Sequence, residues 1–176
     1  LILQAAISIS GFYAKLPIDF PPKIFLLGIL PALLFIVFLI FTKRQWIDSL
    51  YLKNIMFLNV IRVFVEIALF GLYIVHLAPK EMTFEGHNFD ILVGLTAPIV
   101  VYYGFVKSTL SSKILLIWNI LGLILLLIVV SIGFKSVLVA QNTMGILIFP
   151  FSWLPTFIVP VVLFGHLVAI RQLLKK

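Results

Sequence analysis

The stretch Asn-Val-Ile-Arg-Val-Phe-Val-Glu, residues 59–66, decides how the chain is interpreted, because it places an arginine and a glutamate inside an apolar segment. The surrounding residues 54–78 are long and apolar enough to form a transmembrane helix. Ionisable side chains at membrane depth are costly, so they face a bundle interior or a water-filled cavity and mark a candidate functional site. Arg62 and Glu66 are therefore the first candidates for a site inside a helical bundle.

The composition excludes a water-soluble fold and makes a lipid bilayer the expected partner. Of the 176 residues, 63% are hydrophobic and 11% are charged, whereas soluble domains average about 45–50% and about 25%. The mean hydropathy is +1.26, and the apolar residues occur in blocks of the length that crosses a bilayer. The chain contains no cysteine, which excludes disulfides, thiolate metal sites and cysteine nucleophiles.

These blocks predict an all-α, polytopic transmembrane bundle of about six helices, in a single domain over residues 1–176. The first residue is Leu1, so we expect the chain to begin inside its first helix, which is then truncated. Prolines and clusters of charge separate the blocks. The expected helices cover residues 1–14, 22–42, 54–78, 89–106, 114–134 and 146–170. Prolines 150, 155 and 160 predict a kinked or partly re-entrant start for the last helix.

The basic residues predict an orientation rather than a nucleic-acid partner. The net charge is +7, but these residues lie singly or in pairs at the ends of apolar blocks, where they anchor helices. Alternate connectors hold eight and four of them, respectively Lys43, Arg44, Lys53, Lys107, Lys113, Arg171, Lys175 and Lys176 against Lys15, Lys23, Lys80 and Lys135. The positive-inside rule places the eight, and with them the C-terminus, in the cytoplasm. The loop around Glu85 then faces outward.

Polar side chains of the third expected helix form a stripe. At 100° per residue, five of them project within an arc of roughly 100°, namely Asn59, Arg62, Glu66, Tyr73 and His76. A polar stripe on an apolar helix should face protein or water rather than lipid. Asn119, the one strongly polar interior residue of the fifth expected helix, is the predicted partner of this stripe.

The pair Arg62 and Glu66 has two interpretations. The residues are four apart, so they are neighbours on a helix surface. In the structural interpretation they neutralise one another and, with the two asparagines of the stripe, hold the third helix against the fifth. In the functional interpretation Arg62 binds an anionic or carbonyl ligand, and Glu66 is its counter-ion or a proton carrier. Both interpretations stay open at this point.

The most polar loop offers a second candidate site, made of Glu85, His87 and Asp90. Imidazole and carboxylate groups can hold a metal ion or act as acid and base, although their spacing matches no recognised metal signature. The alternative is a solvated loop that caps the next helix. We find no His-Glu-x-x-His, Gly-x-Ser-x-Gly or phosphate-binding glycine loop, so no catalytic residue, metal or cofactor is assigned.

The histidines do not predict a haem site. A bis-histidine haem needs two ligands at one membrane depth, whereas His76 is expected near the outer end of the third helix. His166 is expected near the inner end of the sixth helix, and we interpret it as a packed or interfacial side chain.

Three stretches carry a resemblance to a known family. They are Met-Thr-Phe-Glu-Gly-His-Asn-Phe-Asp-Ile-Leu-Val-Gly-Leu-Thr-Ala-Pro at residues 82–98, Arg-Val-Phe-Val-Glu at 62–66, and Pro-Phe-Ser-Trp-Leu-Pro at 150–155 followed by His-Leu-Val-Ala-Ile-Arg-Gln-Leu at 166–173. Together they resemble a family of uncharacterised multi-pass proteins that is common in Bacteroidetes-like genomes. The resemblance implies a location in the bacterial inner membrane and implies no activity.

Three functions are compatible with these features. The first is a non-enzymatic integral membrane protein that recognises or conducts a small polar or ionic solute along the stripe. The second is a small structural subunit of a larger membrane complex, whose partners would be other membrane subunits. The third is a membrane-embedded enzyme with an acid/base or metal site in the outer loop. The sequence favours the first, because the stripe joins the bundle interior to the polar loop.

Overall fold

The computed structural model describes residues 1–15, 20–86, 88–139 and 144–175, which form helices, turns and loops without a strand. The prediction of an all-α bundle is therefore confirmed. Four helices are long and apolar enough to cross a membrane: Phe25–Thr42, Leu52–Ile74, Ser112–Leu138 and Leu154–Leu174. Ile91–Val106 is a shorter apolar helix. By helix length and composition, the chain is a multi-pass membrane protein.

The helices follow one another with short connections. In chain order they are α1 (Ile2–Ile9), η1 (Phe25–Ile29), α2 (Leu30–Thr42), α3 (Arg44–Ser49), α4 (Leu52–Phe57), η2 (Leu58–Val60), α5 (Ile61–Ile74), η3 (Lys80–Met82), α6 (Ile91–Val101), η4 (Tyr102–Val106), α7 (Ser112–Val139), η5 (Met144–Leu147), η6 (Leu154–Ile158) and α8 (Val159–Leu174). The label η marks 3-10 or π turns, most of which extend an adjoining α-helix. The last helix begins at Leu154, after a 3-10 turn and a proline-containing loop.

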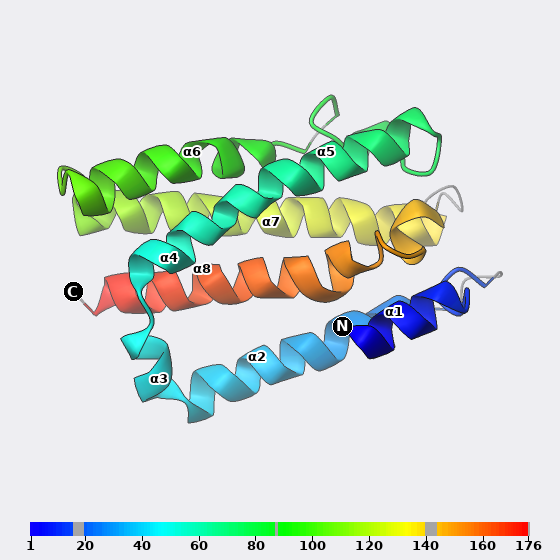
Figure 1. Cartoon of the computed structure of the whole chain (residues 1–176), viewed down its shortest axis with the longest axis horizontal. Helices are drawn as coiled ribbons and strands as arrows, with labels where there is room; N and C mark the ends of the chain where they lie inside the picture. Colours follow the sequence, from blue (N-terminus) through cyan, green and yellow to red (C-terminus); the bar gives the residue numbers. More distant parts are fainter. Residues whose placement is uncertain (16–19, 87, 140–143, 176) are drawn as a thin grey trace.

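The long helices lie side by side, with α8 between the α4–α7 group and α2 (Figure 1). At one end of the bundle, on the left in Figure 1, lie α3, the C-terminus and the connector between α6 and α7. The connector that follows α5 lies at the opposite end. The short helix α1 packs beside η1, which leads into α2, and Gln4 Nε2 donates a hydrogen bond to Leu27 O of η1 at 2.8 Å. That carbonyl needs a donor because Pro31, four residues on, has no N–H.

One continuous stripe of α4, η2 and α5 faces the interior. Its buried residues recur every three or four positions, as the helical period requires, and they are Leu52, Met56, Asn59, Arg62, Glu66, Leu69 and Leu72. The stripe is apolar at both ends and polar in the middle. The bundle therefore has a polar layer between two apolar ones.

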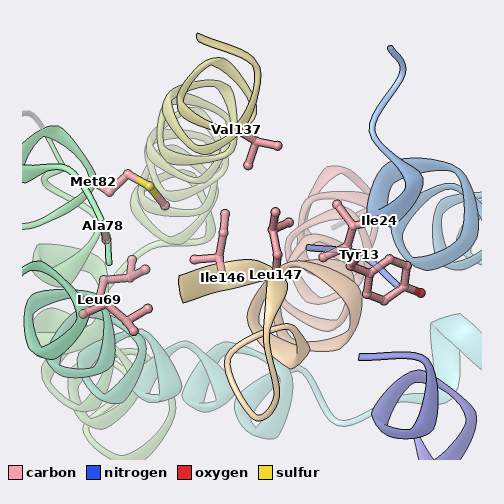
Figure 2. Close-up of a cluster of buried hydrophobic side chains, with 9 residues drawn as sticks. Tyr13, Ile24, Leu69, Ala78, Met82, Val137, Ile146 and Leu147 are labelled. Carbon is pink, nitrogen blue, oxygen red and sulfur yellow. The ribbon is translucent and has the colours of Figure 1, made fainter. Parts of the chain in front are cut away.

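The two apolar layers are separate clusters of buried side chains. One joins α5 and α7 to the segments around Tyr13, Ile24 and Leu147, whose side chains converge in Figure 2. The other joins α4, α6, α7 and α8 through residues such as Met56, Leu115 and Ala169, nearer the end that carries α3. Between membrane helices such side chains stabilise the bundle through van der Waals packing, and the two clusters enclose the polar layer on both sides.

Helix α5 ends at Ile74 and does not continue to residue 78. His76 has a left-handed backbone (φ 59°). The His76 N–H donates to Tyr73 O, and the Leu77 N–H donates to Leu72 O at 2.8 Å. This pair of bonds is the Schellman motif, in which the left-handed residue lies just past the end of the helix. His76 is consequently exposed and does not extend the polar stripe.

The segment between α5 and α6 returns into the bundle instead of lying outside it. Thr83, Asn88 and Asp90 are buried, and α6 begins at Ile91, beside the first half of α5 (Figure 1). Non-helical backbone at membrane depth is tolerated where protein surrounds it. Gly94 permits the close contact with α5, because a Cβ there would lie 2.8 Å from Val63 Cγ2.

Candidate functional site

The polar layer is organised around Arg62, which is 1% exposed. Its Nη1 donates to Asp90 Oδ1 at 2.8 Å, and Nη1 and Nη2 each lie 3.1 Å from Gly122 O. Nη2 also lies 2.9 Å from His166 Nε2. The guanidinium thus joins α5 to the start of α6, to α7 and to α8, and its charge is balanced by Asp90.

The contact with Arg62 determines the tautomer of His166. A guanidinium has only donors, so His166 Nε2 must accept, and the ring proton must lie on Nδ1. Nδ1 then donates to Asn119 Oδ1 at 3.2 Å, and Asn119 Nδ2 donates to Leu115 O at 2.9 Å. The imidazole is therefore neutral, and every polar side-chain atom of His166 and Asn119 has a partner.

Glu66 belongs to a second branch of the layer. Its Oε1 accepts a hydrogen bond from Asn88 Nδ2, which also donates to Met82 O at 3.0 Å. Asn88 Oδ1 accepts from the backbone N–H of Asp90 at 3.0 Å, so this one asparagine fixes the returning segment. Glu66 Oε2 and Arg62 Nε have no hydrogen-bond partner, although both are buried.

A cavity of about 560 Å³ adjoins the polar layer, between α2, α5, α7 and α8. Of the residues that line it, Arg62 and Asp90 are charged, and almost all of the others are apolar. Leu127 and Phe134 on α7 also line it and are 50% and 37% exposed, so the cavity reaches the outer face of the bundle. On that face a membrane protein meets lipid.

The structure brings only part of the predicted site together. Asn59 and Asn119 are buried with Arg62 and Glu66, but the Asn59 amide donates to Met56 O rather than to the network. Tyr73 is half-buried at the edge of the stripe, beside Phe70. The expected ion pair is different: Asp90, and not Glu66, accepts from Arg62.

The structure also separates the candidate site residues of the outer loop. Glu85 is exposed and lies 3.8 Å from Lys80, whereas Asp90 lies inside the bundle because the returning segment carries it there. His87 lies outside the described residues. Among the described residues, no group of three histidine, aspartate or glutamate side chains lies close enough to hold a metal ion.

Comparison with known proteins identifies the family to which the chain belongs. The model of a domain of unknown function, DUF8737, matches residues 20–174. The chain belongs to this family. The match includes all the members of the polar layer, from Asn59 to His166. No curated protein and no solved structure matches the chain.

Three members of the site in this DUF8737 chain were not among the predicted site residues: Asn88, Gly122 and His166. His166 was placed too near a helix end, because α8 continues to Leu174 rather than ending at 170. Eight residues at 1.5 Å each put it about 12 Å inside that end. Gly122 contributes its carbonyl oxygen, and its lack of a side chain leaves room for His166. A Cβ at Gly122 would lie 2.7 Å from His166 Cε1. The sequence signal for Gly122 is its position three residues after Asn119, which places both residues on one face of the helix.

Proposed function

We propose that the protein is a non-enzymatic integral membrane protein that recognises a small solute in the cavity beside Arg62 and Asp90. The observation that carries the proposal is the cavity itself. Its volume of about 560 Å³ lies within the range of about 300–1,000 Å³ typical of ligand sites. Such sites combine a mostly apolar wall with a few polar groups that orient the ligand, and this cavity has that composition.

The wall indicates an amphiphilic solute. Ser131, a further polar residue of the wall, already donates its hydroxyl to Leu127 O at 2.7 Å. An apolar body would contact the valines and leucines of α7 and α8, and its polar or ionic group would lie at Arg62 and Asp90. Access from the lipid side, past Leu127 and Phe134, suits a molecule that partitions into the bilayer.

Recognition is better supported than conduction along the stripe. The stripe stops short of His76, which is exposed beyond the end of α5. Past Glu66, the interior stripe continues as Leu69 and Leu72, and Leu69 belongs to the apolar cluster of Figure 2. A polar solute would have to cross that apolar layer without polar partners.

The test compares what co-purifies with the native protein and with a variant whose cavity is filled. Gly133 lines the cavity, and a Cβ there would meet only Met82 Cε, at 3.5 Å. Gly133→Leu can therefore project into the cavity without a backbone clash. The protein is purified from membranes in mild detergent, and bound compounds are identified by native mass spectrometry. We expect an amphiphile that is present in the native protein and lost in Gly133→Leu.

Gly71→Leu is the matched control. No heavy atom lies within 4 Å of a Cβ at Gly71, which is exposed on α5 and does not line the cavity. The control should keep the compound. The proposal fails if no compound is bound or if both variants bind the same amount. Stoichiometric co-purification of other membrane chains would instead support the subunit function.

We also propose a bacterial inner-membrane location with a cytoplasmic C-terminus. Seven described basic residues lie at the end that holds α3 and the C-terminus: Lys43, Arg44, Lys53, Lys107, Lys113, Arg171 and Lys175. This excess is the positive-inside signature. Because the chain has no cysteine, Lys107→Cys and Lys80→Cys give single labelling sites at opposite ends. An impermeant thiol reagent added to intact cells should label Lys80→Cys only, and the reverse pattern would contradict the orientation.

A further inference from the structure

The polar layer holds two carboxyl groups and one guanidinium. Each Nη of Arg62 carries two hydrogens, and the two nitrogens together lie within hydrogen-bond distance of Asp90, Gly122 and His166. None of these hydrogen bonds goes to Glu66. Among the described residues, Arg62 is the single buried cation and forms its ion pair with Asp90. Glu66 therefore has no ion-pair partner among these residues.

Glu66 is also closed off from bulk solvent, and among the described residues only Asn88 donates a hydrogen bond to it. The residue is 0% exposed, Oε1 accepts from the neutral amide of Asn88, and Oε2 has no partner. An ionised carboxylate in such a place would be a buried, unpaired charge, which is among the most costly arrangements in a protein. A neutral carboxylic acid avoids that cost.

Among the described residues, the neighbouring elements supply no other charge that could compensate, since Lys80, Glu81 and Glu85 of the returning segment are exposed. On its own helix Glu66 has Arg62, the returning segment contributes Asp90, and α8 contributes His166, which is neutral because Nε2 accepts from Arg62. Helix α6 has no ionisable side chain before Tyr102. The side chain of Lys135 on α7 is exposed. With both carboxyls ionised, the layer would carry a net charge of −1; with one proton, it is neutral.

We propose that Glu66 is a proton-binding site at membrane depth. It holds a proton on Oε2 while Asp90 holds Arg62. When the O–H bond breaks, a water molecule that enters the polar layer takes up the proton, and the new carboxylate competes with Asp90 for the guanidinium. The two carboxyls therefore titrate as one coupled unit, and the pairing of Arg62 determines how firmly Asp90 and the start of α6 are held. This site does not depend on the proposed ligand.

Infrared spectroscopy of the purified full chain in lipid tests the proposal, because a protonated carboxylic acid has a carbonyl band that a carboxylate lacks. Of the three glutamates, Glu81 and Glu85 are exposed. We expect a protonated-carboxyl band at neutral pH that shifts when the protein is made by cell-free synthesis with carboxyl-¹³C glutamate. The band should be lost in Glu66→Gln, in which an amide replaces the neutral acid.

The matched variant is Asp90→Asn, which makes the same change at the other carboxyl. It removes the counter-ion of Arg62, so Glu66 should ionise in its place and the glutamate band should disappear, with a lower unfolding temperature. Glu66→Gln should keep the native unfolding temperature, because it imitates the protonated state. The absence of a glutamate band from the native protein at neutral pH would overturn the proposal, as would a band that persists in Glu66→Gln. The isotope experiment on the native chain decides the question even if a variant does not fold.

Discussion

Arg62 on α5 and His166 on α8 are 104 residues apart in the sequence, and Nη2 of one lies 2.9 Å from Nε2 of the other in the centre of the bundle. Both side chains are almost completely buried. Because α5 and α8 are separated by α6 and α7 along the chain, this contact can form only after α6 and α7 have brought α8 back beside α5. It therefore links the formation of the site to the completion of the fold.

Replacing His166 should destabilise the bundle. In His166→Asn the shorter side chain leaves Arg62 Nη2 with one acceptor fewer and Asn119 Oδ1 without its donor. Each buried polar group left without a partner costs about 1–3 kcal/mol, more than the average of about 0.6 kcal/mol for an interhelical hydrogen bond in a membrane. Unfolding in mixed detergent micelles measures the change. The control is His76→Asn, since His76 is exposed and asparagine tolerates its left-handed backbone; an equal loss in both variants would contradict the role of His166.

Gly122→Ala should displace His166 without removing any polar group. The added Cβ would lie 2.7 Å from His166 Cε1 and 3.2 Å from Nε2, so the ring must move away from Arg62. Forcing one extra methyl into a packed interior costs about 1–3 kcal/mol. Gly71→Ala is the control, because nothing lies within 4 Å of its Cβ and alanine is favoured by up to about 1 kcal/mol in a helix. Equal unfolding of the two variants would contradict the close packing of Gly122 on α7 against His166.

The periodicity of the expected helix 54–78 is enough to predict that Arg62, Glu66 and Asn59 face inward, because apolar and polar residues on a helix report which face is buried. The partner of Arg62 was not predictable in this way. Asp90 reaches it through an irregular segment, whose path depends on the hydrogen bonds of Asn88 and not on a repeat. A helix pattern also could not show that α5 ends in a left-handed residue at His76, which separates that side chain from the stripe.

The charge pair gives a prediction that distinguishes the two possible partners of Arg62. Arg62→Met leaves Asp90 buried without a cation, and removing one member of a buried pair costs about 3–5 kcal/mol. The double variant Arg62→Met/Asp90→Asn removes both charges and should recover most of this loss, because replacing both members is often close to neutral. Arg62→Met/Glu66→Gln should recover little. Chemical unfolding of the three variants measures the effect, and the opposite order would identify Glu66 as the partner.

The contact between α3 and α8 should respond to pH in a defined range. Arg171 Nε donates to Asp48 Oδ1 at 2.9 Å, and Lys175 donates to Oδ2. Hydrogen bonds from Arg171 and then Lys175 lower the pKa of Asp48 from 3.8 to about 2. A carboxyl whose pKa is lowered on folding stabilises the folded state above its unfolded pKa, and this stabilisation is lost as the pH falls through the folded value.

The native protein and Asp48→Asn should therefore differ in unfolding temperature by a constant amount between about pH 5 and 8, where Asp48 is ionised in both states. The difference should shrink as the pH falls below about 5 and disappear only near pH 1, below both the unfolded pKa of 3.8 and the folded pKa of about 2. Added salt should reduce it at neutral pH, because Asp48 is solvent-accessible and its ion pairs are screened. Glu85→Gln at the opposite end controls for the loss of a carboxylate outside the α3–α8 contact. A difference that survives at about pH 1, where Asp48 is protonated in both states, would mean that Asp48 acts through its packing and not through its charge.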